Sequence, residues 1–124
     1  MFDWKKPTVQ MLGRWQPWHD GHTALFKKAL EKTGQVAIMI RDMEVSKGNP
    51  LAGGQVTERI QEVLEKEGYT YNEQYIIVSV PNIVDISYGR DVGYTITQHN
   101  LGKEVHEISA TNIRQQMRQG KYTL

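Results

Sequence analysis

Apolar and polar positions along this chain fall into two alternating kinds of segment. Two short runs, Val36–Ile40 and Tyr75–Val80, are almost continuously apolar, which is typical of strands in a parallel sheet that is covered on both faces. Thr8–Leu12, which contains a shorter apolar run, is predicted as the first strand. Between them, apolar residues recur at helical spacing, from His22 to the glycine at 34 and from Val56 to the glycine at 68. Strand, helix, strand, helix, strand in this order predicts parallel βαβ units.

The rest of the chain is less regular. Residues 1–6 are expected to form a loose lead-in, and the polar residues 41–54 a long loop. A short strand is expected at 92–96, a last strand at 104–108, and a final helix from Ser109 or Thr111. We therefore predict one domain over residues 1–124, of α/β class, with a Rossmann-like, doubly wound parallel sheet in a three-layer α/β/α sandwich.

The carboxyl ends of the predicted strands carry the residues of chemical interest. Gly13, Arg41, Pro81 and Ser109 all come just after a strand. In doubly wound sheets, ligands bind outside the carboxyl ends of the strands. We expect the four loops to meet at one edge and to form a site for two substrates.

The loop after the first strand is the most informative stretch, and it reads Gly-Arg-Trp-Gln-Pro-Trp-His-Asp-Gly-His from Gly13 to His22. A helix begins there, so unpaired N–H groups and the positive end of the helix dipole favour an anion. Two imidazoles and an arginine add donors that suit phosphate oxygens. Gly21 lets the backbone approach a ligand closely. One alternative is an ordinary helix cap with a packed histidine. Another is a zinc site built from His19, His22 and Asp20, with His99 or His106.

Composition restricts the classes of function. The chain has 124 residues, 15 Lys plus Arg, 14 Asp plus Glu and a net charge of +1, which gives no support for binding nucleic acid or an anionic membrane. There is no cysteine, no apolar run of membrane-spanning length and no signal-peptide pattern after Met1. We expect a soluble, cytoplasmic protein.

Two motifs resemble the signatures of the HIGH superfamily of nucleotidyltransferases. The segment from Gly13 to His22 is most similar to the form Gly-Arg-Phe-Gln-Pro-Phe-His-x-Gly-His of archaeal-type nicotinamide-mononucleotide adenylyltransferases, with Trp15 and Trp18 in place of phenylalanine. The second family signature, Ile-Ser-x-Thr-x-x-Arg, is present from Ile108 to Arg114.

This resemblance implies roles for individual residues. As catalytic groups it implies His19 and His22 on the α- and β-phosphate oxygens, and Arg114 on the β/γ end. Residues expected to bind the nucleotide are Gly13, Arg14, Trp15, Gln16, Gly21, Ser109 and Thr111. Residues expected to bind the second substrate, each weighed against an ordinary surface role, are Arg41, Asp42, Asn82, Asp85, Tyr88 and Arg90.

The implied reaction transfers a nucleotidyl group from a nucleoside triphosphate to a phosphorylated small-molecule acceptor and releases pyrophosphate. The acceptor attacks the α-phosphorus directly, so no protein nucleophile is needed. Mg2+ is expected to bind mainly through the triphosphate. ATP is the favoured donor and nicotinamide mononucleotide the nearest family acceptor.

Two other functions stay open at this point. One is a cytidylyltransferase that uses CTP and a phosphorylated alcohol or sugar. The other is a non-catalytic, nucleotide-binding regulatory protein. Family members often form dimers or larger rings, and a small core favours self-association, so a homo-oligomer is also expected.

Overall fold

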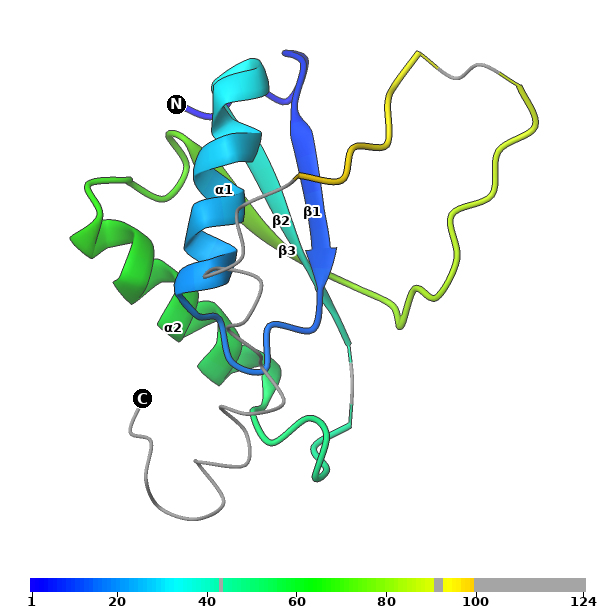
Figure 1. The fold of residues 1–124 in the computed structure, drawn as a ribbon. Coiled ribbons are helices and arrows are strands. Elements are labelled where there is room, and N and C mark those ends of the chain that lie inside the picture. The colour runs from blue at the N-terminus through cyan, green and yellow to red at the C-terminus, as the bar shows by residue number, and fades with distance from the viewer. Residues whose placement is uncertain (43, 91–92, 100–124) are drawn as a thin grey trace.

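The computed structural model describes residues 1–42, 44–90 and 93–99. Five elements follow one another along the chain (Figure 1): β1 (Val9–Gly13), α1 (Asp20–Thr33), β2 (Val36–Arg41), α2 (Gly53–Lys66) and β3 (Tyr75–Val80). All five were predicted from the sequence, with β3 matched at both ends. The α/β class is confirmed.

The three strands form one parallel sheet in the order β1-β2-β3. Gly13 pairs with Ile40, and Arg41 pairs with Val80, so the carboxyl ends of the strands lie at the same edge of the sheet. The loops that follow Gly13, Arg41 and Val80 therefore begin side by side. The expected meeting of these loops at one edge is confirmed for the described strands.

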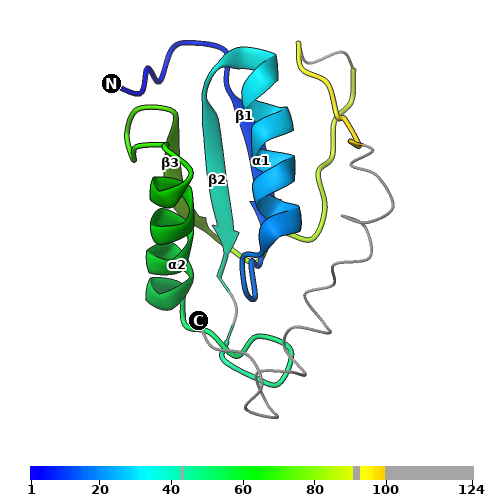
Figure 2. The same cartoon turned by 60° about the vertical axis from the view of Figure 1, so that its left-hand side comes forward.

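Both helices lie on the same face of the sheet (Figure 2). The strand order explains this, because two successive right-handed crossovers in the same direction place their helices on one side. The core between the helices and the sheet contains Phe26 of α1, Ile60 and Leu64 of α2, and Ile38 of β2, all in one buried cluster. The helical layer expected on the opposite face in a three-layer sandwich is not seen among the described residues. The final helix expected from Ser109 or Thr111 lies outside them.

The N-terminal segment covers part of the opposite face, contrary to the loose lead-in that we expected. Phe2 is buried against Ala37 and Ile76. The amide of Gln35 fixes this segment by donating to the Asp3 carbonyl (2.7 Å) and the Thr8 hydroxyl (2.6 Å). The expectation was wrong because one buried aromatic in a polar segment produces no periodic signal.

The strand expected at 92–96 is not found in its described part. Residues 93–99 adopt neither helix nor strand. Tyr94 and Ile96, which would have been the apolar face of that strand, are 56% and 69% exposed. Apolar and polar residues alternate in this segment, but in the described part of the chain it does not pair with β1 or β3. The strand expected at 104–108 and the helix after it lie outside the described residues.

No helix in the described part of the chain has the length and apolar character needed to cross a membrane.

Candidate functional site

The turn between β1 and α1 is shaped by its two tryptophans. Trp15 and Trp18 are 6% and 0% exposed, and their rings lie 5.0 Å apart. The indole nitrogen of Trp15 donates to the Met39 carbonyl on β2, and that of Trp18 donates to the Thr23 hydroxyl on α1. Both side chains therefore pack the turn against its neighbouring elements. Trp18 is completely enclosed by protein.

The need for glycine at position 13 follows from this packing. A Cβ on Gly13 would lie 2.9 Å from the Trp15 ring, which is closer than a normal contact. Trp15 itself has a φ of 53°, a left-handed conformation that is uncommon for a large side chain. The presence of glycine and tryptophan in the motif from Gly13 to His22 is therefore explained in part by the packing of the turn. A nucleotide-binding role for Gly13 and Trp15 stays a prediction.

His19 caps the N-terminus of α1. Its Nδ1 accepts a hydrogen bond from the Gly21 N–H (3.0 Å), and its own N–H donates to Nδ1 of His22 (3.1 Å). The His22 N–H is also used internally, because it donates to the His19 carbonyl (2.9 Å). The helix start therefore offers a ligand fewer free backbone N–H groups than the sequence suggested.

The same hydrogen bonds fix which imidazole nitrogen carries the proton. A neutral imidazole has one donor and one acceptor nitrogen. Because Nδ1 of both His19 and His22 accepts, the proton must be on Nε2 in each ring. The two rings are stacked, with centroids 3.7 Å apart and planes at 19°. The turn thus presents a pair of adjacent Nε2–H donors.

Burial keeps both imidazoles neutral. The pKa of His22 is lowered to about 3, chiefly by burial and further by the neighbouring His19. Burial also lowers the pKa of His19; the carboxylate of Asp20 opposes this effect, and the guanidinium of Arg59 adds to it. At neutral pH the pair therefore donates hydrogen bonds without carrying charge.

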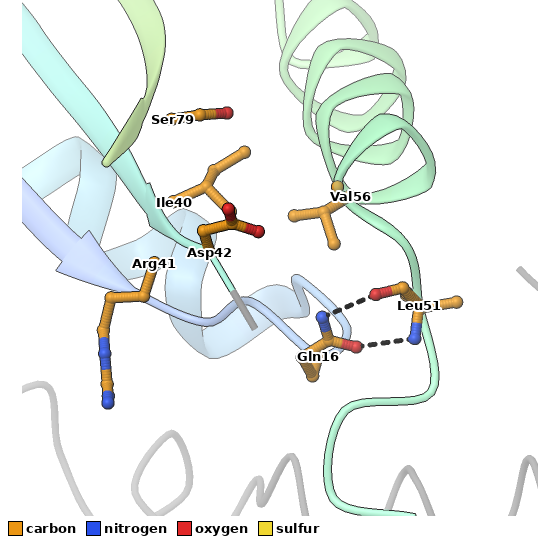
Figure 3. A pocket seen from close by; sticks show the side chains of 8 residues that line it. Gln16, Ile40, Arg41, Asp42, Leu51, Val56 and Ser79 are labelled. Carbon is orange, nitrogen blue, oxygen red and sulfur yellow. Dashed lines mark hydrogen bonds between the residues drawn. The ribbon is translucent and has the colours of Figure 1, made fainter. Parts of the chain in front are cut away.

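Two links attach the following loop to this turn. The side-chain amide of Gln16 donates to the Leu51 carbonyl (2.9 Å) and accepts from the Leu51 N–H (2.8 Å), as Figure 3 shows. Arg14 donates to the Asn49 side chain over 3.4 Å. Gln16 is 4% exposed, so the structure gives it a structural contact, and its nucleotide-binding role stays a prediction.

A small pocket lies beside this link at the carboxyl ends of β2 and β3 (Figure 3). It has a volume of about 30 Å3, and Arg41, Asp42 and Ser79 are among the residues that line it. Sites for small organic ligands occupy about 300–1,000 Å3. An acceptor molecule would therefore need contacts beyond this pocket.

Arg41 and Asn82, two of the residues predicted to bind the second substrate, are brought together. The Arg41 guanidinium donates to the Asn82 side-chain oxygen (2.8 Å). The Nε of Arg41 is buried and has no hydrogen-bond partner among the described residues. Asp42 follows Arg41 in the chain and also lines the pocket. This group is the only part of the predicted second-substrate set that the described structure gathers at the strand ends.

The other predicted residues are not gathered there. The chain after β3 runs away from the sheet (Figure 1), and Asp85, Tyr88 and Arg90 are exposed on it. The carboxylate of Asp85 accepts a hydrogen bond from the neighbouring Ser87 hydroxyl. Ser109, Thr111 and Arg114 lie outside the described residues.

Arg59 was missed by the sequence reasoning. It lies on α2, half-buried, and its Nε donates to the Trp18 carbonyl (3.1 Å). A signal was present in the sequence. Position 59 belongs to the apolar stripe Val56, Ile60, Val63, where an arginine is unusual unless it has a partner.

The zinc alternative gains no support from the described part of the chain. Within residues 1–42, 44–90 and 93–99, no three His, Cys, Asp or Glu side chains are grouped so that they would hold a metal ion. Nδ1 of both His19 and His22 is already used in the helix cap.

Comparison with known proteins points to one family. No protein-family model matches the chain. A nicotinamide-nucleotide adenylyltransferase of Ignicoccus hospitalis is 36% identical over 74 residues, which are 58% of this chain and 43% of that protein. One from Methanococcus aeolicus is 29% identical over 75 residues, or 59% of this chain and 41% of that protein. The matches thus cover less than half the length of either relative. They support the likeness to the nucleotidyltransferases that the two signatures indicated.

Proposed function

We propose that this nucleotidyltransferase-like chain is an adenylyltransferase. It transfers AMP from ATP to a phosphorylated small-molecule acceptor, with nicotinamide mononucleotide as the favoured acceptor, and releases pyrophosphate. The observation that carries the proposal is the pair of Nε2–H donors at the start of α1, directly after β1. Because both relatives are nicotinamide-nucleotide adenylyltransferases, adenylyl transfer is favoured over cytidylyl transfer.

The reaction needs positioning and charge stabilisation and no protein nucleophile. An oxygen of the acceptor phosphate forms a bond to the α-phosphorus of ATP, and the bond from that phosphorus to the bridging oxygen of the β-phosphate breaks. Negative charge develops on the α-phosphate oxygens and on the departing pyrophosphate. In the proposed mechanism, His19 and His22 donate to these oxygens through Nε2. Fixed donors of this kind cost no reorganisation during the reaction.

Neutral imidazoles suit this task. Their hydrogen bonds strengthen as the phosphate oxygens become more negative, and they neither accept nor release a proton near neutral pH. Arg14 follows β1 directly and would supply a positive charge beside them. On the resemblance alone, Ser109, Thr111 and Arg114 would hold the β/γ end of the triphosphate.

The described residues fit a magnesium ion that binds through the nucleotide. Mg2+ prefers oxygen ligands and keeps several waters. The turn offers N–H donors, which suit the phosphate oxygens of the nucleotide and not the ion itself. The ion would therefore be held by triphosphate oxygens and water, and its charge would offset that of the phosphates.

The acceptor is proposed to bind near Arg41. The Arg41 guanidinium donates to the Asn82 side chain, and the buried Nε of Arg41 lacks a hydrogen-bond partner among the described residues. An acceptor phosphate oxygen would satisfy that donor.

The absence of cysteine agrees with a cytoplasmic location for this ATP-dependent reaction.

A pyrophosphate-release assay tests the proposal. ATP and CTP, each with Mg2+, are incubated with the protein and with nicotinamide mononucleotide, a phosphorylated sugar or a phosphorylated alcohol. Release with ATP and nicotinamide mononucleotide is expected, and the variant His22→Asn serves as the low-activity control. Release with CTP and an alcohol or sugar phosphate would identify a cytidylyltransferase instead. Nucleotide binding in a calorimeter without turnover would indicate a regulatory protein, and the absence of both would refute the proposal.

A further inference from the structure

We propose that Arg59 is a positioning residue of the phosphate site, which holds the peptide between Trp18 and His19 in place from α2. This inference rests on the proposed function. Its first support is a direct contact, because Nε of Arg59 donates to the Trp18 carbonyl over 3.1 Å, across 41 residues of sequence. Trp18 directly precedes His19, so this contact acts on the backbone of the capping residue.

The placement of Arg59 on α2 is the second support. Val56 and Ile60, on the same side of the helix, are 1% and 0% exposed and belong to the core. An arginine at such a position covers apolar surface with its stem while its guanidinium reaches a polar partner. Here the guanidinium reaches the turn that carries both imidazoles. The arginine therefore links the packing of α2 to the geometry of the site.

Electrostatics give the third support. Among the described residues, two charged groups influence the His19 imidazole: Asp20 raises its pKa, whereas Arg59 lowers it. The Arg59 charge thus reaches His19 and favours the neutral ring, which is the form that caps α1 through Nδ1. A positive charge that reaches His19 would also attract a polyphosphate bound to the Nε2 atoms. Arg59 therefore supports the site both through a hydrogen bond and through its charge.

The pKa of His19, measured by NMR, separates this role from ordinary packing. In Arg59→Gln, loss of the positive charge is expected to raise that pKa. Asp20→Asn is the matched control, in which loss of the negative charge is expected to lower it. Arg59→Lys restores the charge and is expected to return the pKa toward that of the unmodified protein. A purely structural arginine would alter thermal stability and leave the His19 titration unchanged, which would overturn the proposal.

Turnover supplies the second readout. In folded Arg59→Gln, kcat is expected to fall by about 10²-fold, as for a misplaced catalytic group, with partial recovery in Arg59→Lys. An unchanged kcat would overturn the proposal.

Tripolyphosphate added to the unmodified protein provides a test that needs no variant. We expect the NMR signals of the Arg59 Nε–H and the His19 Nε2–H to shift as tripolyphosphate is added. Both shifts should follow the same saturation curve. A shift of His19 without Arg59 would refute the role of Arg59. If neither signal shifted, the phosphate site itself, and with it the proposed function, would be wrong. The titrations of His19 in the variants would then still show whether Arg59 acts on this imidazole.

Discussion

The imidazole rings of His19 and His22 lie 3.7 Å apart at 19°, and each uses Nδ1 to complete the N-terminal cap of α1. One side of each ring therefore serves the fold, and Nε2 on the other side is the donor that we propose for a ligand. Because the two nitrogens of an imidazole have separate tasks, substitutions can be chosen that remove one task and keep the other.

The free energy of unfolding is expected to decrease at acidic pH, because the folded protein disfavours the protonated form of His22. Its pKa is about 3 when folded, against an ordinary value of 6.5. Between these values the unfolded chain binds the extra proton, so the free energy of unfolding decreases as pH falls, by up to about 1.4 kcal/mol per pH unit for one group. The contribution is fully present above pH 6.5. Urea unfolding at pH 7, 6 and 5 measures it, and His22→Asn should show a flatter dependence. Equal slopes in the two proteins would contradict the assignment.

Much of the fold could be predicted because its signals are local. The apolar run of β3 and the helical spacing of Val56, Ile60 and Leu64 need no knowledge of distant residues. Gly34 likewise ends α1 in the left-handed conformation that favours glycine.

The details of the site were less predictable because they depend on contacts between distant residues. Nothing near Gln16 in the sequence indicates that it pairs with Leu51. Histidine is not among the usual N-cap residues, so a helix cap was only the less favoured interpretation of the two histidines. Arg59 was overlooked because its partner, Trp18, comes from another element.

Replacing His22 by asparagine should remove activity and keep the helix cap. Asparagine places an acceptor oxygen near the position of Nδ1 and no donor at the position of Nε2. Pyrophosphate release is expected to fall by about 10²–10³-fold, as for the loss of one preorganised donor. His22→Ala should lose comparable activity and also stability, because the His19 N–H loses its acceptor. Full activity of the asparagine variant would exclude His22 from the chemistry.

His19→Asn tests whether histidine is retained at the cap for function. Asparagine is among the best N-cap residues, so the melting temperature should stay the same or rise. Nucleotide binding and turnover should nevertheless weaken, because the second Nε2–H donor is gone. Thermal unfolding and calorimetric titration with ATP measure the two effects. A variant that is clearly less stable would show that the imidazole contributes more than a cap acceptor to the fold.

Gly13→Ala should destabilise the turn by steric conflict. The new Cβ would lie 2.9 Å from the Trp15 ring, and overpacking of this kind costs typically about 1–3 kcal/mol. Near-ultraviolet circular dichroism should report the displaced indole. Gly54→Ala is the matched control, since no described residue lies within 4 Å of the added Cβ and position 54 is helical, so it should be neutral or slightly stabilising. Similar losses in both variants would argue against a specific conflict with Trp15.

Gln16→Met removes both hydrogen bonds to Leu51 while keeping a side chain of similar length. The Leu51 N–H and carbonyl would be left without these partners in a buried place, at a cost of about 1–3 kcal/mol for each unsatisfied group. The matched control is Gln55→Met, because Gln55 makes a comparable hydrogen bond to the Ala52 N–H in an exposed position. Denaturant unfolding should therefore show a large loss for position 16 and a small one for position 55. Hydrogen exchange of the Leu51 amide should also accelerate only in Gln16→Met. If that amide stays protected, Gln16 does not hold the loop to the turn, and an ATP titration of Gln16→Met would then test the predicted nucleotide-binding role directly.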